Sequence, residues 1–271
     1  MEELRERFYS ARRRGHRLFI PFLTGGFPTL EKSLEILMAM AEAGAEIIEL
    51  GIPFSDPIAD GATIQESTYI ALKAGATPRK ILGLAKELTR SYNVSPVILT
   101  YLNPLYRMGV REFVEEARRS GVSGLIIPDL PLEEAKPIKH IAIKNDISLI
   151  LLAAPTTSDE RLKKILQETM GFAYLVSLTG TTGERAKLPE SAIHLLERSK
   201  RLNHETPLAV GFGISSISQA VKLARMGADG IIVGSKIIST IKRSANAVED
   251  VKNLVKSFVK ALQGASQLSG Q

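Results

Sequence analysis

One acidic residue stands inside an otherwise apolar segment, where an ionised side chain would be costly. Along Glu46–Leu50, strand alternation places Glu49 on the side opposite Ile48 and Leu50. If Ile48 and Leu50 face covering helices, Glu49 points into the interior of the fold. Burial there would raise the pKa of its carboxyl group toward the range useful for proton transfer. The structural alternative is a glutamate paired with a basic neighbour.

A second carboxyl group follows in the next loop. Asp60 belongs to the segment Gly51–Gly61, directly after the strand that carries Glu49. Two carboxyl groups held near each other in different surroundings can divide acid and base roles between them. In isolation, an aspartate in a loop is more often a turn or helix-cap residue. The pair therefore predicts acid–base catalysis only if both side chains reach one cavity.

Two glycine-containing loops near the end of the chain predict binding of an anion. Gly213 is followed by Ser215, Ser216 and a helix, and Gly234 with Ser235 begins another helical turn. Glycine lets backbone N–H groups approach an anion closely, and a helix N-terminus adds its positive dipole end. The alternative is two ordinary turns with helix caps. Because the two loops follow successive strands, we favour a phosphate site.

Other chemistries lack suitable side chains. The chain has no cysteine, which excludes disulfides, thiolate zinc sites and thiol nucleophiles. None of its four histidines falls at the end of an expected strand, so neither a serine–histidine pair nor a histidine metal cluster is indicated. No lysine lies within the expected strands, which disfavours a Schiff-base aldolase. A Mg²⁺ site formed by Glu49, Asp60 and Asp129 stays open as a minor alternative, and no metal is expected.

The elements that must position these residues alternate regularly between strands and helices. Glycine-containing joints lead from a helix directly into a strand at three places, which is typical of repeated βα units. We predict an α/β fold with a single (β/α)₈ TIM barrel over residues 1–271, an extra N-terminal helix, an inserted helix near 64–73 and a frayed tail at 264–271. An open, doubly wound sheet is the alternative. The expected strands are Leu18–Phe22, Ile47–Leu50, Val97–Thr100, Leu125–Ile127, Leu149–Ala153, Ala173–Val176, Leu208–Val210 and Ile231–Val233.

Composition is typical of a globular protein and limits the classes of partner that we expect. Apolar residues make up 44% and charged residues 24% of the 271 residues, and the formal charge is +6. The basic residues are scattered over expected helix faces, so we expect no nucleic-acid partner. The longest apolar stretch, Ile147–Pro155, is far shorter than the ~18 residues of a membrane span. We therefore expect no membrane association and a cytoplasmic location.

At the ends of the expected strands, the sequence closely resembles the tryptophan synthase alpha chain family. The motif from Glu49 to Gly61, Glu-Leu-Gly-Ile-Pro-Phe-Ser-Asp-Pro-Ile-Ala-Asp-Gly, is highly specific, and generic phosphate-binding barrels lack it. The resemblance covers nearly the whole chain. Three small departures occur, since Gly25, Ala62 and Thr181 stand where Ala, Pro and Val are expected. The other matching segments are Phe22–Pro28, Tyr101–Pro104, Pro128–Pro131 and Gly211–Ser215.

The resemblance implies retro-aldol cleavage of indole-3-glycerol phosphate to indole and glyceraldehyde 3-phosphate, without a cofactor in this chain. By likeness, Glu49 is the acid–base residue, and Asp60 interacts with the indole N–H. The segment Thr179–Glu184 resembles a closing lid in which Thr182 could bond Asp60. The substrate-binding residues implied by the resemblance are Phe22, Tyr101, Tyr174, Thr182, Gly183, Phe212, Gly213, Gly234 and Ser235.

The resemblance also implies a partner, the pyridoxal-phosphate-containing beta chain, in an alpha2-beta2 heterotetramer. That chain would cover the mouth of the barrel and receive indole. Two rival functions remain: a different phosphosugar enzyme, such as an isomerase or an indole-glycerol-phosphate synthase, and a non-catalytic binding subunit. The residues expected at the partner interface are Asp56, Pro57, Asn103, Pro104, Asp129 and Pro131.

Overall fold

The strands form a single sheet that closes on itself as a barrel. In this computed structural model, which describes residues 2–176, 188–202, 205–211 and 213–265, the paired strands run parallel and their order is β5-β4-β3-β2-β1-β9-β8-β7-β6. The strands are β1 (Leu18–Thr24), β2 (Ile47–Gly51), β3 (Ser95–Leu99), β4 (Gly124–Ile126), β5 (Ser148–Ile150), β6 (Leu152–Ala153), β7 (Ala173–Val176), β8 (Leu208–Gly211) and β9 (Gly230–Val233).

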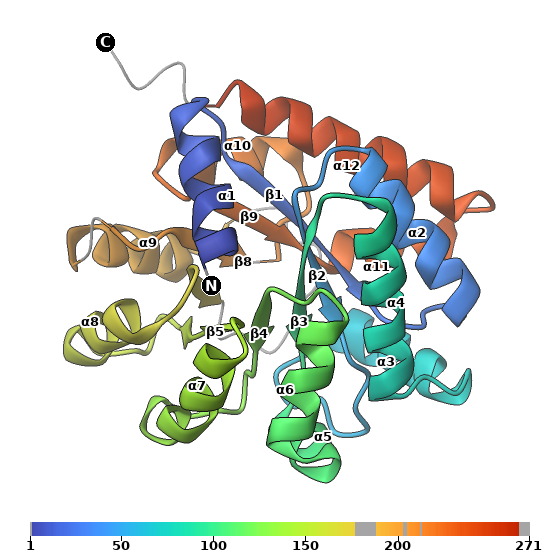
Figure 1. The fold of residues 1–271 in the computed structure, drawn as a ribbon. Coiled ribbons are helices and arrows are strands. Elements are labelled where there is room, and N and C mark those ends of the chain that lie inside the picture. Colours follow the sequence, from blue (N-terminus) through green and yellow to red (C-terminus); the bar gives the residue numbers. More distant parts are fainter. Residues whose placement is uncertain (1, 177–187, 203–204, 212, 266–271) are drawn as a thin grey trace.

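Helices surround this barrel (Figure 1). Three of them begin at residue types that favour helix starts: the Thr29, Thr77 and Ser158 side chains accept hydrogen bonds from backbone N–H groups at the starts of α2, α4 and α8. The helices are α1 (Glu2–Arg13), α2 (Leu30–Glu42), α3 (Ala62–Lys73), α4 (Pro78–Ser91), α5 (Leu102–Met108), α6 (Val110–Arg119), the 3₁₀ turn η1 (Leu132–Glu134), α7 (Ala135–Lys144), α8 (Asp159–Glu168), α9 (Glu190–Leu202), α10 (Ile217–Arg225), α11 (Ser235–Arg243) and α12 (Ala247–Gln263).

The segment 148–153 closes the barrel, because β5 pairs with β4 and β6 pairs with β7. The sequence predicts one strand here, whereas the structure divides it at Leu151. The Leu151 N–H donates to the Thr169 hydroxyl at 2.9 Å, so at this residue the strand hydrogen-bond pattern is interrupted. The closed strand order confirms the barrel and shows that the open, doubly wound alternative was wrong.

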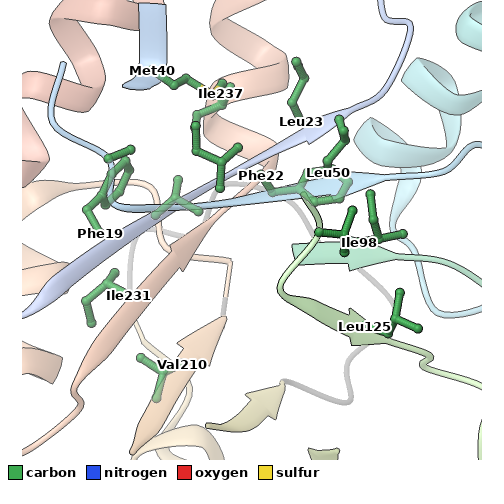
Figure 2. Packing of buried hydrophobic residues seen from close by; sticks show 14 of the residues in the cluster. Phe19, Phe22, Leu23, Met40, Leu50, Ile98, Leu125, Val210, Ile231 and Ile237 are labelled. Atoms are coloured by element: carbon green, nitrogen blue, oxygen red, sulfur yellow. The ribbon is translucent and has the colours of Figure 1, made fainter. Parts of the chain in front are cut away.

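Two layers of side chains follow the alternation of the strands. Outward-facing residues such as Leu50, Ile98 and Leu125 pack under the helices, and Figure 2 shows them with Met40 and Ile237 from α2 and α11. Inward-facing residues fill the barrel. Leu4 and Phe8, two buried residues of α1, pack against them and close the amino-terminal end of the barrel. At the other end of the barrel, where the strands have their carboxyl ends, there is a cavity.

The helix inserted after β2 and the N-terminal helix are both confirmed as α3 and α1. Helix α12 ends at Gln263, and Ala265 is buried; residues 266–271, most of the tail expected to fray, lie outside the described residues. The loops after β3 and β4 contain two elements that the sequence did not predict, α5 and η1. Among the described helices, none combines the length and apolar character required to cross a membrane.

Candidate active site

A cavity of about 560 Å³ opens at the carboxyl ends of the strands. In parallel βα barrels this end carries the loops that can vary without disturbing the barrel. Side chains from β1, β2, β7 and the loop after β2 contribute to its wall, and among them are both predicted carboxyl groups, Glu49 and Asp60. The prediction that these two side chains reach one cavity is confirmed.

Glu49 lies inside the barrel, as strand alternation predicts. Ile48 and Leu50 belong to the cluster under the helices, whereas Ile47 belongs to the interior cluster. Glu49 is 1% exposed and lies beside Phe22 on β1 and Val97 on β3. Within the described residues, neither carboxyl oxygen of Glu49 has a hydrogen-bond partner. Burial, followed by the nearby negative charge of Asp60, raises the Glu49 pKa to about 8. At neutral pH, Glu49 is therefore mostly protonated and can donate a proton.

Asp60, in the loop after β2, has a more polar environment than Glu49. Burial raises its pKa to about 6, and a hydrogen bond from the Tyr101 hydroxyl to Asp60 Oδ2, at 3.1 Å, opposes that rise. The Gln65 side chain also donates to the Asp60 carbonyl oxygen at 2.9 Å. Asp60 is therefore mostly ionised at pH 7. Their surroundings therefore hold the two carboxyl groups in different protonation states at neutral pH.

Two aromatic rings line the cavity, and glycines make room for them. Phe22 and Tyr174 both belong to the cavity wall. A Cβ atom on Gly51 would lie 2.8 Å from the Phe22 ring, and one on Gly211 would lie 2.7 Å from the Tyr174 ring. A side chain at either glycine would therefore displace the neighbouring ring. Aromatic rings in a cavity wall suit a flat apolar ligand.

The loops after β8 and β9 form the part of the wall next to these rings. Gly213, which has a φ of +70°, lines the cavity together with Gly234 and Ser235 at the start of α11. The N–H groups of Ser215 and Ser216 instead donate to the Gln219 side chain, within the capping box of α10. Of the residues predicted to bind an anion, Gly213 and those at the N-terminus of α11 therefore remain candidates, whereas the backbone N–H groups of Ser215 and Ser216 are used within the protein.

Some predicted site residues lie elsewhere or outside the described part of the chain. Tyr101 is 1% exposed and does not line the cavity; it lies behind Asp60. Thr182, Gly183 and Phe212, with the whole segment Thr179–Glu184, lie outside the described residues.

The residues predicted at the partner interface gather around the mouth. Asp56, Asn103 and Pro131 are exposed, and Pro57, Pro104 and Asp129 are partly buried. Asn103 and Pro104 lie in the first turn of α5 rather than in a loop. Ile58, which is 80% exposed, adds a large apolar side chain to this rim.

Several cavity residues were missed from the sequence. Leu99 and Leu152 are strand residues next to the interior cluster, and alternation could have found them. Arg161 lines the cavity and forms two hydrogen bonds to Glu133, a contact between α8 and η1 that no sequence signal indicates. Among the described residues, no group of three His, Asp or Glu side chains is placed to hold a metal ion.

Comparison with known proteins agrees with this geometry. A family model described as the tryptophan synthase alpha chain matches residues 8–267. The tryptophan synthase alpha chain of Pyrococcus furiosus is 48% identical over 242 residues, which cover 89% of this chain and 96% of the relative. The corresponding chain of Prochlorococcus marinus is 43% identical over 242 residues, 89% of this chain and 90% of the relative.

Solved structures agree as well. A chain of Mycobacterium tuberculosis tryptophan synthase superposes with a TM-score of 0.89 at 32% identity and covers 96% of this chain and 98% of its own. A chain of the tryptophan synthase complex from Pyrococcus furiosus has a TM-score of 0.84 at 44% identity, with coverages of 91% and 98%. With matches of this length and identity, this chain belongs to the tryptophan synthase alpha chain family.

Proposed function

We propose that this chain cleaves indole-3-glycerol phosphate into indole and glyceraldehyde 3-phosphate. The observation that carries the proposal is the buried Glu49 carboxyl group, which faces the same cavity as the more readily ionised Asp60. The family to which the chain belongs suggests this reaction, and the cavity wall contains aromatic rings beside the N-terminus of α11.

The reaction uses the two carboxyl groups in different protonation states. Protonated Glu49 donates its proton to the indole ring carbon that bears the side chain, and positive charge develops on the ring nitrogen. Ionised Asp60 stabilises that charge through the ring N–H, an interaction stronger in the transition state than in the ground state. Glu49, now a carboxylate, takes the proton of the side-chain hydroxyl as the carbon–carbon bond breaks, and the bonding electrons return to the ring. Each proton is accounted for, and the step calls for no cofactor in this chain.

Incubating the purified chain with indole-3-glycerol phosphate tests the proposal. We expect indole and glyceraldehyde 3-phosphate to appear in equal amounts. Conversion to any other product would favour a different phosphosugar enzyme, and binding without turnover, with or without a partner, would favour a non-catalytic subunit.

The phosphate group is expected to bind at Gly213, Gly234 and Ser235. Valine at Gly234 is a poor probe, because its Cβ would lie 3.0 Å from the Phe22 ring and disturb the indole wall as well. Ser235→Asp instead places a negative charge at the start of α11, and Ser235→Asn is its uncharged control. The new carboxylate and the phosphate would repel each other at a few ångströms. We therefore expect glycerol 3-phosphate to bind the aspartate variant at least about tenfold more weakly than the asparagine variant.

Calorimetric titration with glycerol 3-phosphate and, separately, with indole measures this effect. Indole binding should differ by less than about twofold between the two variants, since a neutral ligand gains no repulsion. Equal losses for both ligands would place the phosphate elsewhere.

We further propose that a pyridoxal-phosphate-containing beta chain covers the mouth of the barrel, in an alpha2-beta2 heterotetramer located in the cytoplasm. The exposed Asp56, Ile58 and Asn103 supply polar and apolar groups for docking. Proline-stiffened loops lose little conformational freedom on binding. A structure of the tryptophan synthase complex among the similar proteins supports such an assembly.

Asp56→Ala is expected to weaken association with the beta chain at least about tenfold, as for loss of a charged interface contact, while indole release by the isolated chain changes less than twofold. Glu249→Ala, on the exposed side of α12, is the matched control. Sedimentation and indole release are followed while purified beta chain is titrated in. Unaltered association of the Asp56 variant would exclude this residue from the interface.

A further inference from the structure

Tyr101 is a buried residue next to the site whose hydroxyl group has a defined pair of partners. It is the residue before α5 and is 1% exposed, and its ring lies 5.5 Å from that of Phe54. Its hydroxyl donates to Asp60 Oδ2 at 3.1 Å and accepts from the Ala59 N–H at the same distance. The tyrosine is thus attached both to the Asp60 carboxyl group and to the backbone immediately before it.

The position of Tyr101 is itself fixed by a third loop. The Leu102 N–H, adjacent to Tyr101, donates to both carboxylate oxygens of Asp129, at 3.0 and 3.2 Å. Asp129 follows β4, whereas Tyr101 follows β3 and Asp60 follows β2. These hydrogen bonds, joined through the Tyr101–Leu102 backbone, connect the loops after β2, β3 and β4 and end at Asp60.

The electrostatic surroundings of Asp60 show why the Tyr101 hydroxyl matters to its carboxyl group. The titratable groups that face Asp60 or Tyr101 are Glu49, Tyr174 and Asp129, all of which are acidic or neutral. Burial raises the Asp60 pKa, and the Tyr101 hydrogen bond lowers it. A hydrogen bond donated to a carboxylate favours its charged form.

We propose that Tyr101 is a positioning residue for the cleavage reaction, one whose hydroxyl holds the Asp60 carboxylate ionised and fixed at the cavity wall. The inference rests on the proposed function only for its effect on turnover. It assigns Tyr101 a role behind Asp60 rather than direct contact with the substrate, which the resemblance implies.

Tyr101→Phe tests the proposal, because it removes the hydroxyl and keeps the ring against Phe54. A lost hydrogen bond to a charged group predicts that the Asp60 titration midpoint rises by about one pH unit. The acidic limb of kcat/KM for indole release should move with it. The loss should then be about fivefold near pH 6, approach about tenfold below about pH 5 and become much smaller near pH 8, with kcat affected more than KM.

Tyr106→Phe, an exposed tyrosine on α5, is the matched control and should behave as the parent protein. Titration of the Asp60 carboxyl carbon by NMR in the intact chain provides a readout independent of turnover. An unshifted midpoint, or a loss of activity that is uniform at every pH, would overturn the proposal. If the parent protein releases no indole, the proposed function fails, while a shifted Asp60 titration would still support the role of Tyr101.

Discussion

Glu49→Gln is expected to lower the rate of indole release at least about a hundredfold, the lower range for loss of a general acid–base group. Glutamine keeps the shape of the side chain but has no acidic proton to donate to the ring carbon. It also has no carboxylate to accept the hydroxyl proton afterwards. Steady-state indole production by the purified variant measures the effect, and retention of more than about a tenth of the activity would contradict the assignment.

The stability of the same variant distinguishes loss of chemistry from loss of folding. In the folded protein the Glu49 pKa is about 8, against 4.5 for the ordinary glutamate. The folded state therefore keeps a proton that the unfolded state releases, and stability falls as pH rises from about 4.5 to about 8. Glutamine removes this dependence. The variant should melt at a higher temperature than the parent at pH 8, and the difference should shrink toward pH 5.

Glu46→Gln is the matched control for both measurements. Glu46 lies just before the same strand and pairs with Arg14 near the surface, at 2.7 Å. Its replacement should change indole release less than twofold and leave the pH dependence of the melting temperature intact, because a half-exposed ion pair contributes less than about 1 kcal/mol. A similar activity loss in this control would point to a general disturbance of β2.

Asp60→Asn is expected to lower kcat about a hundredfold or more with a comparatively small change in KM. The asparagine retains hydrogen-bonding capacity but lacks the negative charge that opposes the charge developing on the indole nitrogen. Comparing kcat and KM at pH 7 separates the two effects. An effect on KM alone would make Asp60 a binding residue without a role in the transition state.

Asp250→Asn, on the exposed side of α12, serves as the control for this change and should leave both constants unaffected. Binding of an unreactive substrate analogue that keeps the indole and phosphate groups provides a second check. The Asp60 variant should bind this analogue nearly as well as the parent, since the analogue carries no developing positive charge.

The features that depend on strand alternation could be predicted from the sequence. Ile48 and Leu50 identify the outward face of β2, so the inward direction of Glu49 follows from the residue pattern alone. The positions of Gly234 and Ser235 at the start of a helix follow from the same regular alternation of strands and helices. The starts of α2 and α8 could likewise be predicted, because Thr29 and Ser158 are residue types that favour the N-cap position.

Features that depend on contacts between distant segments could not be predicted. The division of the fifth strand at Leu151 arises from a side chain 18 residues later, Thr169. The links from Asp129 to Leu102 and from Tyr101 to Asp60 join loops that only the barrel brings together. A departure such as Gly25 is explained in the same way, because a Cβ there would lie 2.8 Å from Ile81.

The cleavage mechanism depends above all on Glu49 being a buried, protonated carboxyl group at neutral pH. Infrared difference spectra between the parent and Glu49→Gln isolate the carbonyl band of this single carboxylic acid, and the band can be followed as pH is raised. We expect the band at pH 6 and its loss with a midpoint near 8, as burial and Asp60 dictate. A Glu49 already ionised at pH 6 would contradict the account, because no proton would then be available to begin the cleavage.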